Sequence, residues 1–116
     1  MITIYHKSNC STSLQALALL KKNTKDEIRV VEYLNAVPTQ KELKELVKRL
    51  GIKPEQLVRK KEPLYKERYE GKKITSAEWL RILTQNPILI ERPIVIKDKK
   101  AILCRPPELV LTLFSK

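Results

Sequence analysis

An α/β fold with a mixed four-stranded sheet is predicted by three features of the sequence. Strand-like segments at residues 1–5 and 28–33 flank a helical segment, helical patterns fill the middle of the chain, and two further strand-like segments precede a last helix. The predicted order is therefore βαβ, a helical insertion at about residues 38–86, and ββα. With 116 residues, of which 42% are hydrophobic, the chain is long enough to bury a core, and we expect a single domain over residues 1–116.

The first three segments predict a strand–helix–strand crossover. Isoleucines alternate with other residues in 1–5, and residues 28–33 are rich in β-branched side chains, as in strands. Between them, apolar residues recur at helical spacing in residues 11–22. The buried face of this helix is expected to consist of Leu14, Leu17, Ala18 and Leu20. Two strands joined through a helix run parallel, with a right-handed crossover.

Two capping boxes mark helices in the middle of the chain. The first begins at Thr39 and its helix ends at Gly51, and the second begins at Thr75 and its helix ends before Pro87. Pro54 suits the first turn of a short helix between them. The leucine and tryptophan residues at helical spacing in these segments are expected to form core, and we assign them no function.

The last part of the chain predicts a β-hairpin and a helix. Residues 94–96 and 101–104 are apolar and flank a polar turn, and a final α-helix is expected from Pro106 to Phe114. The complete order of elements is that of a thioredoxin-like fold with an enlarged middle.

The composition excludes several kinds of site. The chain has two glycines and one histidine, so it can form neither a glycine-rich dinucleotide loop nor a paired-histidine zinc site, and we expect no metal. Its two cysteines, Cys10 and Cys104, are far apart in the sequence and are expected to be reduced thiols of a cytoplasmic protein. No apolar run is long enough to cross a bilayer and no secretory signal is visible, so we expect no membrane partner.

The net charge of +11 is spread along the whole chain. Scattered lysine is typical of a solvated surface, although such charge also steers anions toward a cleft. Aromatic residues rarely accompany the basic ones, which is weak support for stacking with bases. Nucleic acid is therefore not an expected partner.

Cys10 is the strongest candidate for chemistry. It follows the first strand after a polar turn and stands where the helix at 11–22 begins, so the helix amides favour its thiolate, which is the nucleophilic form. A buried structural cysteine is the alternative, but serine, threonine and asparagine around the sulfur make a poor core. The backbone amides of Ser11, Thr12 and Ser13 are expected to form an anion site beside the sulfur.

Three arginines are expected to complete this site. Arg92 precedes Pro93 at the start of a strand, Arg105 precedes Pro106 after the last strand, and Arg59 follows a short helix. In the predicted fold the two prolines place their arginines at one edge of the sheet, and the Arg92–Pro93 bond is a candidate for the cis form. A thiolate, free amides and guanidinium groups suit the binding of a tetrahedral oxyanion and its attack by sulfur. The alternative is that each arginine pairs with a nearby acidic residue.

Several stretches, taken together, resemble the glutaredoxin-dependent arsenate reductases over nearly the whole chain. They are Ile4-Tyr5-His6 with Cys10 and Ser13; Tyr33-Leu34; Leu57-Val58-Arg59-Lys60 with Tyr65; Asn86-Pro87-Ile88-Leu89-Ile90-Glu91-Arg92-Pro93-Ile94-Val95; and Cys104-Arg105-Pro106-Pro107-Glu108. The resemblance implies a thioredoxin-like fold and the reduction of arsenate to arsenite.

The same resemblance implies a reaction path. Cys10 attacks arsenate to give a thiol-arsenate adduct, glutathione displaces it as a co-substrate, and glutaredoxin reduces the mixed species to release arsenite. No bound cofactor is implied. Cys104 matches a cysteine that the family does not require, so it is left out of the mechanism.

The resemblance also implies roles for five residues besides Cys10. Arg59, Arg92 and Arg105 match arginines that hold the oxyanion or the intermediate. His6 matches a histidine that influences the ionisation of the cysteine, and Ser13 matches a hydroxyl near the sulfur.

Two alternative functions would use the same fold. A regulator resembling the Spx type binds RNA polymerase and generally carries a C-x-x-C switch, but Ser13 stands at the second position of that motif here. A glutathione-linked thiol oxidoreductase would also use Cys10, with the arginines binding glutathione carboxylates. The sequence barely separates this second alternative from a reductase.

Overall fold

The computed structural model describes residues 2–7 and 9–114. The chain divides into two compact units, a sheet unit (Met1–Ala36 with Arg92–Lys116) and a helical unit (Val37–Glu91). The helical unit is therefore inserted into the sequence of the sheet unit. The single-domain organisation expected from the sequence, with an insertion at about residues 38–86, stays a prediction.

A mixed four-stranded sheet in the order β2-β1-β3-β4 forms the centre of the sheet unit. β1 (Ile2–His6) pairs in parallel with β2 (Ile28–Glu32). β3 (Ile94–Lys97) runs antiparallel to both β1 and β4 (Lys100–Leu103). The α/β thioredoxin-like fold and the mixed sheet predicted from the sequence are confirmed.

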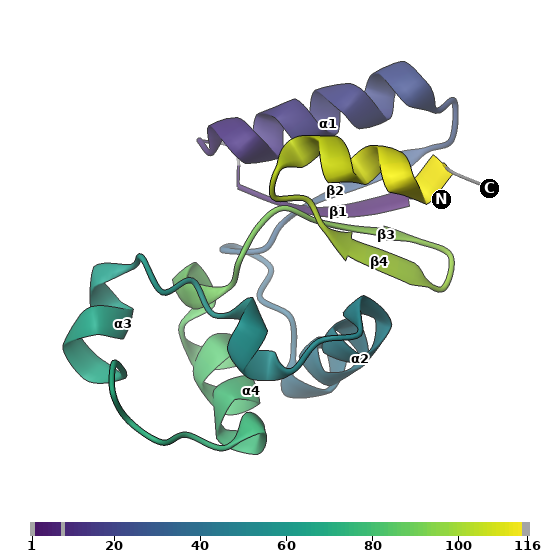
Figure 1. The fold of residues 1–116 in the computed structure, drawn as a ribbon. Helices are drawn as coiled ribbons and strands as arrows, with labels where there is room; N and C mark the ends of the chain where they lie inside the picture. The colour runs from purple at the N-terminus through teal and green to yellow at the C-terminus, as the bar shows by residue number, and fades with distance from the viewer. Residues whose placement is uncertain (1, 8, 115–116) are drawn as a thin grey trace. The chain divides into compact units, whose positions relative to one another are not determined.

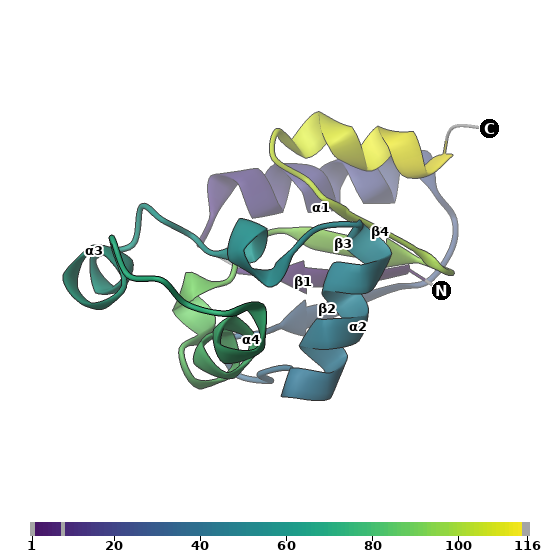
Figure 2. The same cartoon turned by 60° about the horizontal axis from the view of Figure 1, so that its bottom comes forward.

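Two helices cover one face of this sheet, as Figures 1 and 2 show from two directions: α1 (Ser11–Asn23) and the 3-10 helix η3 (Pro107–Phe114). The core between them and the sheet consists of Ile2, Ile4, Ala16, Leu20, Val95, Cys104, Val110 and Leu113. The expected final α-helix is thus a 3-10 helix of eight residues, longer than most helices of this kind.

The buried face of α1 differs from the one predicted. Ser13, Ala16 and Leu20 are its buried residues, whereas Leu14 is 49% exposed and Ala18 is also exposed. The prediction counted only apolar side chains. The structure buries a serine instead, because its hydroxyl is hydrogen-bonded to the end of β1 and sets the rotation of the helix.

Short helices make up the helical unit. They are α2 (Gln40–Leu50), η1 (Pro54–Leu57), α3 (Pro63–Arg68), α4 (Ser76–Gln85) and η2 (Pro87–Leu89). An isolated antiparallel bridge joins Val58 to Ile90 next to η1 and η2. The predicted core stripes are buried here, with Leu43, Leu46 and Val47 in α2 and Trp79, Ile82 and Leu83 in α4.

The helix boundaries follow the local capping chemistry. Thr39 Oγ1 accepts a hydrogen bond from the Glu42 amide, and the Glu42 carboxylate accepts one from the Thr39 amide, both at 3.1 Å. Gly51 ends α2 with a φ of 69°, in the left-handed region that favours glycine. At the start of α4, Thr75 Oγ1 accepts a bond from the Glu78 amide at 3.2 Å. The two helix starts and the stop at Gly51 are as predicted, but of the capping box expected at Thr75 the structure shows only this one bond.

The sequence analysis missed α3, a helix of six residues. Its one local signal is Pro63 in the first turn, and it is too short for a hydrophobic period to appear. Tyr65 of α3 stacks against Trp79 of α4, with ring centroids 6.3 Å apart. Tertiary packing on α4 therefore stabilises this helix more than its own sequence does.

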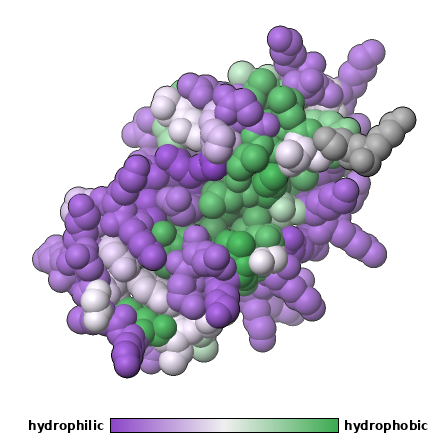
Figure 3. Space-filling view, viewed as in Figure 1, coloured by the Kyte–Doolittle hydropathy of each residue, from purple (hydrophilic) through white to green (hydrophobic). Residues whose placement is uncertain are grey.

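Polar and charged side chains cover much of the face shown in Figure 3, in keeping with a charge of +11. Within residues 2–7 and 9–114, no helix has both the length and the apolar character that a membrane span requires.

Candidate active site

Cys10 stands at the N-terminus of α1, where the turn after β1 ends. Its amide donates to the Lys7 carbonyl, and its carbonyl accepts the Leu14 amide as the first bond of the helix, both at 3.0 Å. Ser11 and Thr12 form the first turn behind it. The thiol is partly exposed, so a dissolved reactant can reach it. The amides of a first helical turn lack helical acceptors and favour a negative charge at this position.

The pKa of the Cys10 thiol lies below its usual value. Partial burial raises this pKa, but a hydrogen bond from the Ser13 backbone amide lowers it. A hydrogen bond and the positive charge of Arg92, and a hydrogen bond from Arg105, lower it further. More of the thiol is therefore ionised near neutral pH than in an ordinary cysteine, and the thiolate is already surrounded by donors.

Arg92 and Arg105 meet at one end of the sheet. Arg92 is only 4% exposed, and both the Arg92–Pro93 and Arg105–Pro106 peptide bonds are cis. Arg105 Nη1 donates to the Arg92 carbonyl at 2.8 Å, which ties the segment after β4 to the segment before β3. The structure thus brings both of these predicted arginines to the sulfur of Cys10.

His6 and Ser13 form a buried pair beneath the loop that carries Cys10. His6 Nδ1 lies 2.8 Å from Ser13 Oγ, which also accepts the Lys7 amide at 3.2 Å. His6 is 3% exposed and Ser13 is fully buried. One hydroxyl therefore links the end of β1 to the first turn of α1. In this arrangement Ser13 acts on the site twice, through its hydroxyl on the loop and through its amide on the sulfur.

Arg59 belongs to the helical unit, where acidic residues surround it. Its Nε donates to Glu62 Oε1 at 3.0 Å, and its Nη1 lies 3.7 Å from Glu91 Oε1. The pairing with nearby acids that the sequence left open is thus what the structure shows for Arg59. A role for this arginine in holding an oxyanion stays a prediction.

Comparison with known proteins places this geometry in a family. The model of the ArsC family matches residues 5–113. The chain belongs to the ArsC family. Over 97% of its length it is 39% identical to an arsenate reductase of Acidiphilium multivorum, 79% of which is covered. It is 42% identical to the uncharacterized protein YfgD of Escherichia coli, with 97% of this chain and 95% of YfgD covered. The solved structure of an arsenate reductase from Vibrio cholerae is similar with a TM-score of 0.90 and 38% identity, covering 96% of this chain and 95% of that one.

Tyr33 interacts with Arg92 in the candidate site of this ArsC chain, although the sequence analysis named it only within a matching stretch and gave it no role. It directly follows β2 and is 1% exposed. Burial lowers the pKa of Arg92, but interactions with Tyr33 and Cys10 outweigh this and raise it above its usual value. In the parallel pairing of β1 and β2, Glu32 lies opposite His6. The residue that follows Glu32 is therefore at the same end of the sheet as the Cys10 turn, and this position could have indicated Tyr33.

Cys104, the second cysteine of this ArsC chain, is in the core. It is fully buried, burial raises the pKa of its thiol to about 12, and its Sγ lies 3.8 Å from the Ile102 carbonyl oxygen. At neutral pH the thiol stays protonated and is a poor nucleophile.

Within residues 2–7 and 9–114 of this ArsC chain, no group of three or more His, Cys, Asp or Glu side chains could hold a metal ion.

Proposed function

We propose that this chain is an arsenate reductase that uses Cys10 as its nucleophile and takes electrons from glutathione and glutaredoxin. The observation that carries the proposal is the Cys10 thiol, whose pKa is lowered by Ser13, Arg92 and Arg105 despite partial burial. Relatives named arsenate reductase that match nearly the whole chain support arsenate as the oxyanion.

The proposed reaction begins when the Cys10 thiolate attacks the arsenic of arsenate. A sulfur–arsenic bond forms, and one arsenate oxygen leaves as water after taking up protons. The glutathione thiol then attacks the arsenic and displaces Cys10, which leaves as a thiol after taking up a proton. A glutaredoxin thiol attacks the glutathione sulfur, a sulfur–sulfur bond forms, and the sulfur–arsenic bond breaks with its electron pair left on arsenic. Conversion of arsenic(V) to arsenic(III) takes two electrons, which two thiols supply by ending as a disulfide. Arsenite is released and Cys10 returns as a free thiol.

The arginines act on charge in this scheme. Arg92 and Arg105 stabilise the thiolate before attack and the oxyanion during attack, because guanidinium groups bind such oxygens with paired hydrogen bonds. Arg59 is assigned to the same oxyanion by the family resemblance. The first-turn amides at Ser11 and Thr12 add to the positive field, and no bound cofactor is needed.

The supply of glutathione and glutaredoxin suits a cytoplasmic location. We therefore propose that the protein works in the cytoplasm, with arsenate as its small-molecule partner and neither membrane nor nucleic acid as a partner.

A coupled assay tests the proposal directly. Arsenate-dependent oxidation of NADPH is followed with glutathione, glutaredoxin and glutathione reductase, and Cys10→Ser serves as the blank. We expect turnover with the native chain and none with the blank. If the native chain gives no turnover while Cys10 still reacts with an alkylating reagent, arsenate is not the substrate. A glutathione-linked thiol oxidoreductase would then be the better description.

A further inference from the structure

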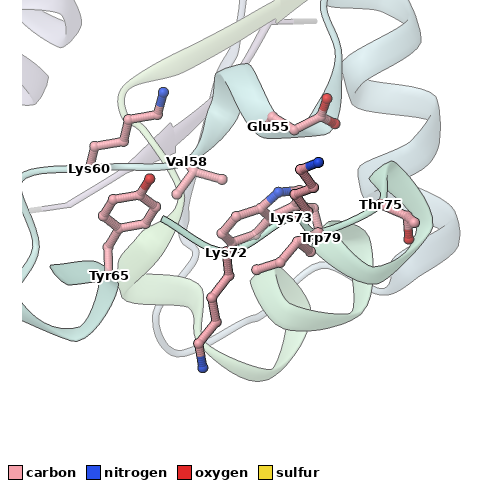
Figure 4. Close-up of a pocket in the computed structure, with 9 residues that line it drawn as sticks. Glu55, Val58, Lys60, Tyr65, Lys72, Lys73, Thr75 and Trp79 are labelled. Carbon is pink, nitrogen blue, oxygen red and sulfur yellow. The ribbon is translucent and has the colours of Figure 1, made fainter. Parts of the chain in front are cut away.

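The helical unit contains a cavity of about 440 Å³ whose lining includes no residue of the Cys10 site (Figure 4). Its walls come from η1, the segment that joins η1 to α3, α3 itself, the segment that joins α3 to α4, and α4. Small-molecule sites in proteins typically measure about 300–1,000 Å³. The cavity is thus large enough for a ligand well above the size of an inorganic ion.

The apolar wall of the cavity is held in place by aromatic packing. Trp79 is 6% exposed, and two tyrosine rings pack against it: Tyr65, whose ring is inclined by 21°, and Tyr69, whose centroid is 5.6 Å away. Val58 and Ile74 extend this wall. The half-buried ring of Tyr65 lines the cavity and is held against Trp79, so it offers a fixed aromatic surface on which a ligand ring can stack with little loss of side-chain freedom.

The polar lining carries a net positive charge. Lys60, Lys72 and Lys73 contribute cations against the single carboxylate of Glu55. In Figure 4 the side chain of Lys72 extends away from Lys60 and Glu55. Ser76 Oγ donates to Glu55 Oε1 at 2.6 Å, which lowers the pKa of this carboxyl and keeps it ionised as a hydrogen-bond acceptor.

We propose that this cavity binds a small organic phosphate carrying an aromatic ring, of the chemical class of a nucleoside diphosphate. Lysine ammonium groups bind phosphate oxygens as point charges. The aromatic wall accepts the ring, and Glu55 and Thr75 offer acceptors for sugar hydroxyls. This site goes beyond the proposed reductase function and does not depend on it.

The chain carries its own reporter for this site, because Trp79 is its only tryptophan. Its emission is followed while the full-length native protein is titrated with ADP at low salt, and calorimetry repeats the titration without an optical signal. We expect saturable binding of ADP that weakens as salt is added. Adenosine and inorganic phosphate, each carrying half of the recognised chemistry, are expected to bind at least about tenfold more weakly.

A pair of double variants separates the cavity from the general positive charge. Lys60→Ala with Lys73→Ala removes two cations from the lining, whereas Lys21→Ala with Lys22→Ala removes two exposed cations from the last turn of α1 in the other unit. We expect the first pair to weaken ADP binding at least about tenfold and the second to change it less than about twofold. Lys72→Glu serves as an independent variant, for which we also expect ADP binding to weaken at least about tenfold.

Three results would overturn the proposal. One is the lack of a saturable ADP signal in both fluorescence and calorimetry. Another is equal ADP affinity in the two double variants, which would mean binding by net charge alone. The third is inorganic phosphate binding as tightly as ADP, which would leave no role for the aromatic wall.

Discussion

Replacing Ser13 with alanine is expected to destabilise the protein and to slow the reaction of Cys10 at the same time. Ser13 Oγ lies 2.8 Å from His6 Nδ1 and accepts the Lys7 amide at 3.2 Å. The alanine side chain fits the same buried space, so the change removes hydrogen bonds without adding bulk. The backbone amide that faces the sulfur remains, but the loop before Cys10 loses its attachment to α1.

The expected loss follows from the burial of the two partners. A buried polar group left without a hydrogen bond costs about 1–3 kcal/mol. His6 is 3% exposed and bears most of this cost, whereas Lys7 is half-buried, so water replaces part of its lost bond. We therefore expect the free energy of unfolding to fall by about 2–3 kcal/mol.

Urea denaturation followed by circular dichroism measures this change, from the shift in midpoint at constant slope. Alkylation of Cys10 by iodoacetamide at pH 7 measures the second effect and is expected to slow. Ser11→Ala is the matched control, because it removes an exposed serine from the same helical turn. If Ser13→Ala lowers the free energy of unfolding by no more than this control does, the hydroxyl does not hold the loop and the reasoning is wrong.

Four further predictions concern the cysteines and their neighbours. In Arg92→Gln the pH midpoint of Cys10 alkylation should rise, with a rate at pH 7 at least about threefold lower, because the cation that favours the thiolate is gone. Because the pKa of the Cys10 thiol is lower in the folded protein than in the unfolded chain, ionisation of Cys10 stabilises the fold. This stabilisation is complete above the pKa of the unfolded thiol and is lost as the pH falls through the lower pKa of the folded protein. Tyr33→Phe should raise the pH midpoint of Cys10 alkylation in the native protein but not in the Arg92→Gln variant. An equal rise in both would show that the Tyr33 hydroxyl does not act through Arg92. A disulfide reagent at pH 8 should count one thiol in the native protein and two in denaturant, and rapid reaction of Cys104 in the folded state would contradict its burial.

The sequence predicted the sheet and most of the site because the signals were local. A proline directly after Arg92 and another directly after Arg105 mark strand ends, and a cysteine before an amphipathic segment marks a helix start. Once the βαβ and ββ segments are joined in one mixed sheet, the topology brings these ends together. The meeting of Arg105 with the Arg92 carbonyl follows from that topology.

What the sequence did not reveal depends on tertiary contacts. The burial of Ser13 in place of Leu14 rests on a hydrogen bond to another element, which hydrophobic periodicity does not register. The interaction of Tyr33 with Arg92 joins residues far apart in the chain and has no local pattern. Helix α3 exists because Tyr65 packs on α4, so its six residues carry little signal of their own.

In the proposed reaction, the burial of Cys104 makes the protein depend on external thiols for reducing power. The chain has two cysteines, and the second is enclosed in the core with its proton retained at neutral pH. An oxidised or substituted Cys10 therefore has no reactive partner thiol within its own chain to restore it. In the proposed reaction the enzyme stores no electrons between turnovers, and its sustained rate follows the external thiol pool. When that pool is exhausted, the protein stops with its sulfur still modified.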